Sequence, residues 1–229
     1  MENRNKSTFS VTFLWLAVFF CVCLIASNLF ATKVISVFGI NLPGAVVIFP
    51  ISYILNDCIV EVWGYRKARL VIWMGFAMNF FVILAGQLVV WLPAASFWEG
   101  APHFGFMFNM APRVAGASLL AFLAGSTLNS LVLSKMKIAD KGRRFGLRAI
   151  VSSVAGELTD SLIFMPIVFL GTPVRTLISM MLAQVTFKVC YELLILPVTT
   201  LVVRKLKESE KTDVYDTGIS YNPFRIGDV

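Results

Sequence analysis

The fold is decided by an uncharged run near the N-terminus, which reads FSVTFLWLAVFFCVCLIASNLFA over Phe9–Ala31. A helix that crosses the hydrocarbon core of a bilayer needs about 20 mostly apolar residues, and this run is long enough. It is too long for the core of a signal peptide, and Lys33 and more apolar sequence follow it in place of a small-residue cleavage site. The run therefore predicts a membrane-spanning helix.

The composition of the whole chain indicates the same class. Of its 229 residues, 58% are hydrophobic and 14% are charged, whereas soluble domains have roughly 45–50% and about 25%. These values exclude a soluble enzyme, a disordered chain and a nucleic-acid-binding domain as first interpretations. The sequence lacks Walker A, HExxH and GxSxG patterns. We therefore expect neither an enzyme nor a cofactor.

The four cysteines lie in apolar runs and do not have the paired spacing of a zinc site or a disulfide framework. We expect them to be small buried hydrophobic residues and expect no metal site. They are Cys21, Cys23, Cys58 and Cys190.

Five further apolar runs follow the first. We predict an all-α membrane protein with residues 1–8 as a cytoplasmic N-terminus, residues 9–203 as a six-helix transmembrane domain and residues 204–229 as a cytoplasmic C-terminal tail. The predicted spans are Phe9–Ala31, Leu42–Trp63, Leu70–Leu92, Val114–Leu133, Ala149–Leu170 and Leu177–Val203.

The basic residues set the expected orientation. Cytoplasmic loops carry an excess of Lys and Arg, and with the N-terminus inside, 16 of the 20 basic residues fall inside and 3 outside. We therefore predict that both termini are cytoplasmic, and we interpret Lys135–Arg148 as a cytoplasmic loop that touches anionic headgroups. On the other side, the aromatic residues of Trp91–Pro112 are typical of an interfacial belt, with a substrate lid as the alternative.

The six spans divide into two halves of three, which must be inverted in the membrane if they are related. Each half has an acidic pair in its second span and an asparagine followed by a lysine at its first. This echo is weak, so the sequence leaves open a 3+3 inverted repeat or two unrelated halves. The recurring pairs are Asp57/Glu61, Glu157/Asp160, Asn28/Lys33 and Asn129/Lys135.

Six charged side chains fall inside the predicted spans, where each costs roughly 2.5–3.5 kcal/mol on insertion scales. Five of them are acids, so a single lysine can neutralise only part of the charge; its most plausible partner is Asp160 or Glu157. Glu61 lies near the cytoplasmic end, where it can also pair with Arg66 or Lys67. The six are Asp57, Glu61, Glu157, Asp160, Lys188 and Glu192.

Helical spacing places these charges, with other polar residues, in stripes that can face one central cavity. Hydrogen bonds between helices without a ligand are the alternative, but such structural contacts have little use for five carboxylates. Pro43 and Pro50 can break the second span. The predicted gating or proton-relay residues are Lys33, Pro50 and Glu61. The predicted substrate-binding residues are Asn28, Tyr53, Asp57, Asn79, Glu157, Asp160, Gln184, Lys188 and Glu192.

Carboxylates, amides and aromatic rings together suit a flat polar ligand that is rich in hydrogen-bond donors. One carboxylate can accept two parallel N–H bonds from a guanine-like edge, and Phe49, Phe164 and Tyr191 can stack on a ring. This chemistry fits nucleobases, pterins, amines and other heterocycles equally.

Several strings resemble a known family. They are ASNLFATK (Ala26–Lys33), GINLPGAVVIFPISYILNDCIVEVWGYRKAR (Gly39–Arg69), GELTDS (Gly156–Ser161), QVTFKVCYELLILP (Gln184–Pro197) and DVYDTGISYNPF (Asp213–Phe224). Together they resemble the queuosine precursor transporter family of bacterial inner-membrane proteins, once named vitamin uptake transporters.

The resemblance implies a six-helix inner-membrane importer of 7-deazaguanines, such as 7-cyano- or 7-aminomethyl-7-deazaguanine, or of queuine, for tRNA modification. It also implies a fold similar to the substrate-binding subunits of energy-coupling-factor transporters. The expected partners are the small-molecule substrate and membrane lipid, not nucleic acid.

Other functions remain open at this point. They are a transporter of another heterocycle such as a vitamin or purine, and a binding-only subunit that needs a separate ATPase. An intramembrane aspartyl enzyme is a third, but the GxGD context of such proteases is absent. Facilitated diffusion, proton coupling and sodium coupling all stay open for the energetics.

Overall fold

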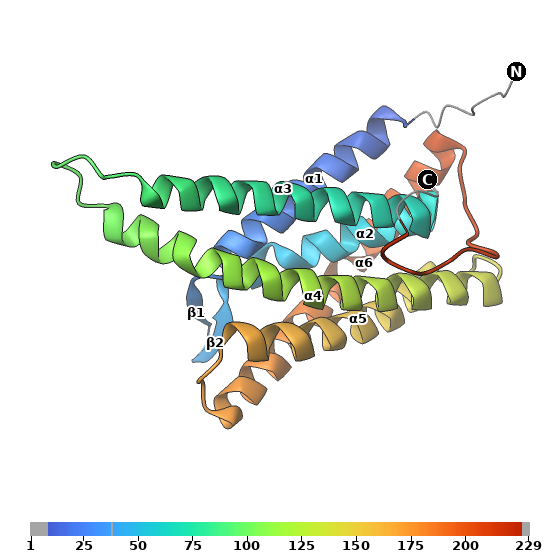
Figure 1. The fold of residues 1–229 in the computed structure, drawn as a ribbon. Coiled ribbons are helices and arrows are strands. Elements are labelled where there is room, and N and C mark those ends of the chain that lie inside the picture. The colour runs from blue at the N-terminus through green and yellow to red at the C-terminus, as the bar shows by residue number, and fades with distance from the viewer. Residues whose placement is uncertain (1–8, 38, 226–229) are drawn as a thin grey trace, which may run out of the picture.

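The computed structural model describes residues 9–37 and 39–225, and Figure 1 shows a helical bundle with a small β-ribbon at one end. The predicted N-terminal segment 1–8 lies outside the described residues, as do residues 226–229 of the predicted tail. The described part forms α1 (Val11–Phe30), β1 (Val34–Val37), β2 (Ile40–Pro43), the 3-10 helix η1 (Gly44–Val47), α2 (Phe49–Trp63), α3 (Tyr65–Trp91), α4 (Ala101–Ala139), α5 (Phe145–Val168) and α6 (Val174–Glu210).

Five of these helices, α1, α3, α4, α5 and α6, are long and apolar enough to cross a membrane. The chain is therefore a multi-pass membrane protein with five candidate spans. The helix α2 has 15 residues and is not among them. All of its residues except Ile51 and Ile54 are buried, because α1, α3, α4 and α6 pack around it.

The prediction of one helix over Leu42–Trp63 is wrong. The segment is divided into the end of β2, then η1, then α2. Pro43 is extended and precedes η1, and Pro50 lies in the first turn of α2. Proline fits there because its missing N–H has no partner in the first turn of a helix. The two prolines therefore divide the span, as their positions predicted.

The all-α expectation also missed the ribbon of β1 and β2. The strands are antiparallel, with Val34 opposite Pro43 and Val37 opposite Ile40. Its signals are β-branched residues on both sides of Gly39, which has a φ of 79°. Hydropathy alone does not separate such a ribbon from the apolar helices that flank it.

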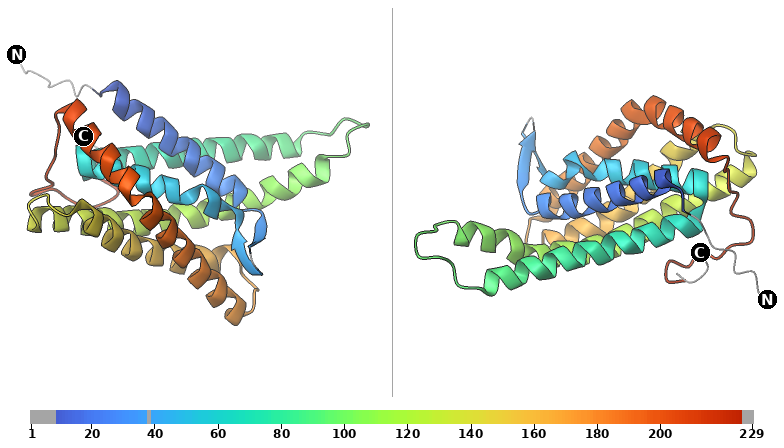
Figure 2. Two further views of the ribbon diagram at one scale, coloured as in Figure 1. Left: turned by 180° about the vertical axis from the view of Figure 1, so that it is seen from behind. Right: turned by 90° about the horizontal axis from the view of Figure 1, so that it is seen from above.

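The ends of the bundle differ. In both Figure 1 and Figure 2, α1 begins and α6 finishes at the end that also holds the α4–α5 turn. The ribbon and the α5–α6 turn lie at the opposite end. We call these the tail end and the ribbon end. The long helices α4 and α5 pack side by side in antiparallel fashion.

The helices α3, α4, α5 and α6 are longer than predicted, and α4 and α6 exceed their predicted bounds the most. The helix α4 begins at Ala101 rather than Val114 and passes through Pro112, and α6 continues to Glu210 rather than Val203. Hydropathy detects only the apolar part of a helix. The additional N-terminal turns of α4 are stabilised by packing against α3. A Cβ on Gly86 of α3 would lie 1.9 Å from the ring of Phe108, so the extension of α4 packs directly on the α3 backbone.

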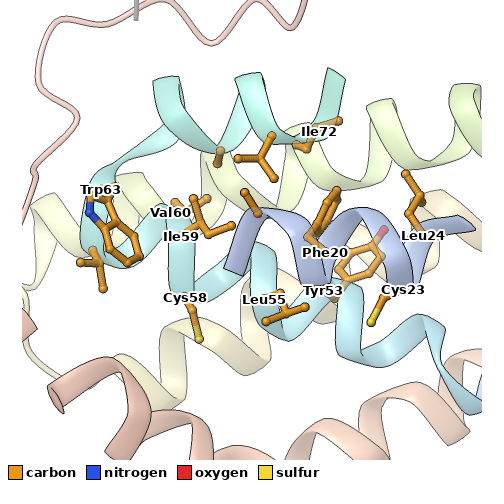
Figure 3. Close-up of a cluster of buried hydrophobic side chains, with 14 of the residues drawn as sticks. Phe20, Cys23, Leu24, Tyr53, Leu55, Cys58, Ile59, Val60, Trp63 and Ile72 are labelled. Atoms are coloured by element: carbon orange, nitrogen blue, oxygen red, sulfur yellow. The ribbon is translucent and has the colours of Figure 1, made fainter. Parts of the chain in front are cut away.

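An aromatic cluster forms the centre of the apolar core. The ring of Phe122 on α4 lies 5.3–5.9 Å from the rings of Phe20, Phe49, Tyr53 and Phe76. Figure 3 shows side chains of α1, α2 and α3 pointing toward one another in the same core. This packing fixes the position of α2, which carries polar residues on its other side.

The cysteines are free thiols, and Cys23 and Cys58 are buried as expected. The prediction of burial is wrong for Cys190, which is exposed. It lies on α6, whose most apolar stretch has few contacts with the rest of the bundle.

Candidate functional site

Four helices, α2, α4, α5 and α6, bring polar side chains together at three successive levels. The Lys188 cluster contains Lys188, Glu157 and Asp160; the Ser153 cluster contains Ser153, Asp57, Glu192 and Asn129; the Glu61 cluster contains Glu61, Lys137, Arg148 and Lys207. The Lys188 cluster is nearest the ribbon end and the Glu61 cluster nearest the tail end.

The Lys188 cluster has one cation and two acids. The ammonium group of Lys188 donates to Glu157 Oε2 at 2.5 Å and to Asp160 Oδ2 at 3.1 Å. It also lies 4.1 Å from the centre of the Phe49 ring on α2, a contact that favours a cation in a dry site. The sequence predicted that Lys188 neutralises one of these acids, and in the structure it contacts both.

A small cavity lies beside Asp160 on the ribbon-end side of the cluster. It is built from α1, the β2–η1 segment, α2, α4, α5 and α6, so it joins both halves of the chain. Its lining residues are Ser27, Asn28, Ala31, Pro43, Ala45, Phe49, Ser118, Asp160, Phe164 and Gln184.

Four polar atoms of these residues have no hydrogen-bond partner among the described residues. They are Ser27 Oγ, Asn28 Nδ2, Asp160 Oδ1 and Gln184 Oε1. Buried polar atoms are normally bonded, and leaving one unbonded costs about 1–3 kcal/mol. The four atoms provide a hydroxyl, a donor and two acceptors, so they can bind a ligand that has both donors and acceptors.

The cavity has a volume of about 20 Å³, which has room for roughly one water molecule. Pockets for small organic ligands are much larger, at roughly 300–1,000 Å³. This conformation is therefore contracted around its polar atoms, and a heterocycle can enter only after side chains or helices move.

Close packing of α4 on α5 positions Tyr53 beside the Lys188 cluster. A Cβ on Gly125 would lie 2.7 Å from both the Gly156 carbonyl oxygen and the Tyr53 hydroxyl. Only glycine fits at such a crossing. The Tyr53 ring lies 5.8 Å from Lys188 Nζ, and its hydroxyl has no partner among the described residues. Tyr53 thus lies beside the cluster with a hydroxyl that is free to bond a further group.

In the Ser153 cluster, one hydroxyl lies between two acids. Ser153 Oγ is 2.8 Å from Glu192 Oε1 and 3.4 Å from Asp57 Oδ2. Asn129 Nδ2 donates to Asp57 Oδ1 at 2.5 Å. Within the part of the chain that the structure describes, no Lys, Arg or His forms an ion pair with Asp57 or Glu192.

The Glu61 cluster is rich in cations. Glu61 Oε1 accepts hydrogen bonds from Arg148 Nη2 at 3.1 Å and from Lys207 Nζ at 2.6 Å. Lys137 Nζ donates to the Glu61 carbonyl oxygen at 2.7 Å. From the sequence we expected Glu61 to be able to pair with the adjacent Arg66 or Lys67. In the structure its side chain contacts Lys137 of α4, Arg148 of α5 and Lys207 of α6.

The prediction of one loop over Lys135–Arg148 is wrong, whereas the contact of this stretch with headgroups stays a prediction. The helix α4 continues to Ala139 and α5 begins at Phe145, so only a short turn separates them. Lys137 and Arg148 are buried and bind Glu61. Their charges are used inside the protein, because the carboxylate of Glu61 lies within their reach.

A C-terminal strap, residues 213–224, crosses the tail end of the bundle. Asp216 accepts hydrogen bonds from the Tyr65 backbone N–H at 3.0 Å and from the Ser134 hydroxyl at 3.0 Å. Arg69 donates to the Asn222 carbonyl at 2.7 Å, and the Trp73 indole donates to the Pro223 carbonyl at 2.7 Å. The strap therefore ties α3 to α4.

Gly64 makes room for the strap at the α2–α3 corner. Its φ of 85° lies in the left-handed region, and a Cβ there would be 2.8 Å from both Asp216 Oδ1 and Val214 Cγ1. Glycine adopts the left-handed conformation without strain and has no Cβ to clash with the strap. The strap can therefore pack at this corner only because residue 64 is glycine.

The two strap acids differ in pKa. Burial raises the pKa of Asp216 above its usual value, although hydrogen bonds from Tyr65 and Ser134 oppose it. Burial acts in the same direction on Asp213, but hydrogen bonds from Lys137 and Lys207 outweigh it and hold the pKa of Asp213 below its usual value. Asp213 is therefore an ionised partner of the Glu61 cluster's lysines.

The remaining predicted residues lie apart from the cavity. Lys33 is exposed at the start of the ribbon, where its carbonyl accepts the Gly44 N–H at 2.7 Å. Pro50 is buried in the first turn of α2. Asn79 is buried on α3, and both its amide atoms lack a partner among the described residues. It is not one of the cavity-lining residues.

Sequence reasoning missed two kinds of residue. Ser27 and Ser118 line the cavity, but a serine in an apolar helix is common and carries no distinct signal. The roles of Lys137, Arg148 and Lys207 depend on contacts between distant parts of the chain, which charge counting does not reveal. The string Asp213–Phe224 contributed to the family resemblance, but it did not indicate which helices the strap contacts.

Comparisons with known proteins identify relatives of the chain. A "Probable queuosine precursor transporter" of Bacillus subtilis (strain 168) is 27% identical over 202 residues, which cover 87% of this chain and 86% of the relative. A "Queuosine precursor transporter" of Escherichia coli (strain K12) is 26% identical over 171 residues, which cover 75% of this chain and 72% of the relative. No solved structure matches the chain.

The family model described as "Putative vitamin uptake transporter" matches residues 43–202, a segment that contains all three polar clusters except Lys207. The matched segment is more than half of the chain. The family consists of transporters rather than enzymes. The protein belongs to the "Putative vitamin uptake transporter" family.

Proposed function

We propose that the protein imports queuosine precursors across the bacterial inner membrane for salvage into tRNA. Its substrates are 7-deazaguanines, such as 7-cyano- or 7-aminomethyl-7-deazaguanine, or queuine. The names of both relatives support this substrate class. The observation that carries the proposal is the buried cavity with an unbonded hydroxyl, donor and two acceptors.

The chemistry of the lining residues matches the guanine edge. Its N1–H and exocyclic amine are donors, which the oxygens of Asp160 and Gln184 can accept, and its carbonyl can accept from Asn28 Nδ2. Each hydrogen bond to a charged group contributes about 1.5–3 kcal/mol. Phe49 and Phe164 provide ring surfaces for stacking.

The predicted binding residues have different roles in this function. Asn28, Asp160 and Gln184 contact the substrate, and Glu157, Lys188 and Tyr53 position Asp160 and the cavity wall. Asp57, Asn79 and Glu192 lie outside the lining and do not contact substrate in this proposal.

The orientation belongs to the same proposal. We place the tail end in the cytoplasm, with both termini there, and η1 with α2 as the sixth crossing segment within residues 9–203. The concentration of cations in the Glu61 cluster at the tail end supports this orientation. Residues 204–229 then form the cytoplasmic tail.

We also propose that the two halves are an inverted 3+3 repeat, similar to the substrate-binding subunits of energy-coupling-factor transporters. The middle helices of the halves, α2 and α5, contact each other through Asp57 with Ser153 and Glu61 with Arg148. A pseudo-twofold axis between the middle helices is the arrangement that such a repeat requires.

The test uses a bacterial host that can neither make nor salvage the precursors. At a limiting external concentration of 7-cyano-7-deazaguanine, we expect queuosine in tRNA only when the protein is expressed. Modification that is independent of the protein would overturn the substrate assignment. Competition by unlabelled vitamins or purines, but not by 7-deazaguanines, would favour another heterocycle.

Uptake by the purified protein alone in ion-tight liposomes tests the remaining alternative. Transport without a partner contradicts a binding-only subunit. Binding without transport, restored by a separate ATPase complex, would instead support that role.

A further inference from the structure

We propose that the Ser153 cluster is a proton-binding site, formed by Asp57 and Glu192 on either side of the Ser153 hydroxyl, which couples substrate import to proton entry. The inference rests on the proposed function for its substrate. It assigns a role to two acids that the cavity does not use.

The number of hydrogens carries the argument. A serine hydroxyl has one hydrogen and can donate to one acceptor at a time. Ser153 Oγ faces one carboxyl oxygen of Glu192 at 2.8 Å and one of Asp57 at 3.4 Å. Both contacts are hydrogen bonds only when one carboxyl is protonated and donates to the hydroxyl oxygen. Loss of that proton leaves two anions facing one hydrogen.

A second observation comes from α4. Asn129 is fully buried, and its Nδ2 donates to Asp57 Oδ1, yet the Oδ1 of the same amide has no partner among the described residues. The site therefore holds an unused acceptor beside a carboxyl group. A protonated Asp57 or a water molecule that carries the proton onward can supply the missing donor.

The surrounding charges favour an added proton. On α2, Tyr53 and Glu61 each lie one turn from Asp57, and on α5, Glu157 lies one turn from Ser153. On α6, Lys188 lies one turn from Glu192, but Glu157 and Asp160 already bind it. On α4, the residue that faces Asp57 is Asn129, which is neutral. Two ionised acids would thus be buried beside further acids, which is costly at this depth.

The position of the site suits coupling. It lies between the substrate cavity at Asp160 and the Glu61 cluster at the tail end, and α2, α4, α5 and α6 contribute residues to all three sites. Lys188 and Glu192 are one turn apart on α6, and Ser153 and Glu157 are one turn apart on α5. A shift of α6 relative to α5 would therefore change the substrate site and the proton site together.

A proton fits the site better than a sodium ion. The Asn129 nitrogen places a donor against Asp57, and a donor hydrogen repels a metal cation while it tolerates a protonated neighbour. Sodium dependence is therefore an outcome that contradicts the proposal.

The experiment uses the purified full-length protein in ion-tight liposomes with labelled 7-cyano-7-deazaguanine, a neutral probe. We expect an inward proton gradient of about one pH unit to drive up to about tenfold accumulation for one proton per molecule. A dye inside the liposomes should record acidification when the probe is added. Both measurements use the unmodified protein and do not depend on the folding of a variant.

The variant Glu192→Gln mimics a permanently protonated acid. We expect it to exchange probe across the membrane with little pH dependence while the proton-driven accumulation ratio falls to one. Ser153→Ala should reduce accumulation severalfold. The matched control is Glu208→Gln, which changes an exposed acid on the same helix, paired with Arg204, and should accumulate probe as the unmodified protein does.

Two results separate this inference from the proposed function. If the unmodified protein exchanges the probe but a proton gradient drives no accumulation, or a sodium gradient does, the proton site is wrong and the substrate assignment stands. If the protein does not exchange any 7-deazaguanine, the proposed function fails and the coupling fails with it.

Discussion

The Glu61 cluster, on α2, α4, α5 and α6, and the Lys188 cluster, on α5 and α6, differ in how their charges are arranged. Around Glu61, three cations share Glu61, Asp213 and backbone carbonyls. Around Lys188, one cation serves two acids, and two more acids lie in the neighbouring Ser153 cluster. Asp140 also lies 3.5 Å from Arg148, so three acids balance three cations in the first region, whereas acids outnumber cations in the second.

The comparison of the two clusters suggests a way to distinguish buried charges that stabilise the fold from those that bind substrate. In the Glu61 cluster, basic residues from three helices bind the buried acid and hold the tail end of the bundle together. Its unbonded atoms, Glu61 Oε2 and Arg148 Nε and Nη1, do not line the cavity. The unbonded acceptors of Asp160, in the Lys188 cluster, and of the nearby Gln184 belong to residues that do line the cavity, where a ligand can use them. We therefore expect substitutions in the Lys188 cluster to affect transport, with a loss of stability where the cation is removed, and those in the Glu61 cluster to affect stability alone.

The largest expected effect is that of Lys188→Met. It leaves Glu157 and Asp160 without their cation in a dry site, and removing one partner of a buried pair costs about 3–5 kcal/mol. We expect loss of precursor uptake and lower amounts of folded protein, measured as uptake per molecule at the cell surface and as melting temperature in detergent.

The matched change is Lys207→Met in the other cluster. Arg148 and Lys137 still bind Glu61 there, and Lys207 is partly exposed, so we expect a loss of less than about 1 kcal/mol. The exposed Leu194→Val on α6 is the neutral control. Equal effects of the two lysine changes would contradict the distinction between the clusters.

The next effect in size is that of Asp160→Asn. The amide keeps the shape of the side chain but removes the charge, so the substrate loses a charge-assisted hydrogen bond of about 1.5–3 kcal/mol. We expect the apparent affinity for 7-cyano-7-deazaguanine to fall by about 10-fold or more, with normal insertion. Near-normal uptake at a concentration below the apparent affinity would mean that the cavity is not the substrate site.

Much of this arrangement was predictable from the sequence. The spacing of Tyr53, Asp57 and Glu61 predicted one polar face on the second span, and the structure turns that face toward α5 and α6. The single lysine was expected to meet Glu157 or Asp160, and it meets both. Periodicity works here because a buried charge in a membrane needs a partner, which limits the directions in which it can face.

The parts that failed depend on backbone details or on distant contacts. The ribbon and the short α2 result from Pro43, Gly44 and Pro50 within a continuous apolar run, where hydropathy does not distinguish strand from helix. The partners of Glu61 come from residues 76 to 146 positions further along the chain. Tertiary packing chooses among several nearby cations, and the sequence does not rank them.

A smaller effect is expected from Glu61→Gln. It weakens the bonds to Arg148 and Lys207, but Asp213 and backbone carbonyls still accept from the lysines. We expect a loss of about 1–3 kcal/mol in stability, seen as a lower melting temperature, with unchanged apparent affinity for the precursor. A changed affinity at normal stability would place Glu61 in the transport site instead.

The smallest effect concerns pH and the strap. Because the pKa of Asp213 is lowered by Lys137 and Lys207, its contribution to strap binding is present above the usual aspartate pKa and is lost as pH falls through the lowered value. Asp216 has a raised pKa and takes up a proton first, which favours the bound strap in that range. We therefore expect hydrogen exchange at the Val214 amide, which donates to the Val62 carbonyl, to be faster in Asp213→Asn than in the unmodified protein at neutral pH. The difference should vanish below the lowered Asp213 pKa, once intrinsic exchange rates are corrected for pH. A difference that persists in acid would show that the lysines do not hold the strap through the charge of Asp213.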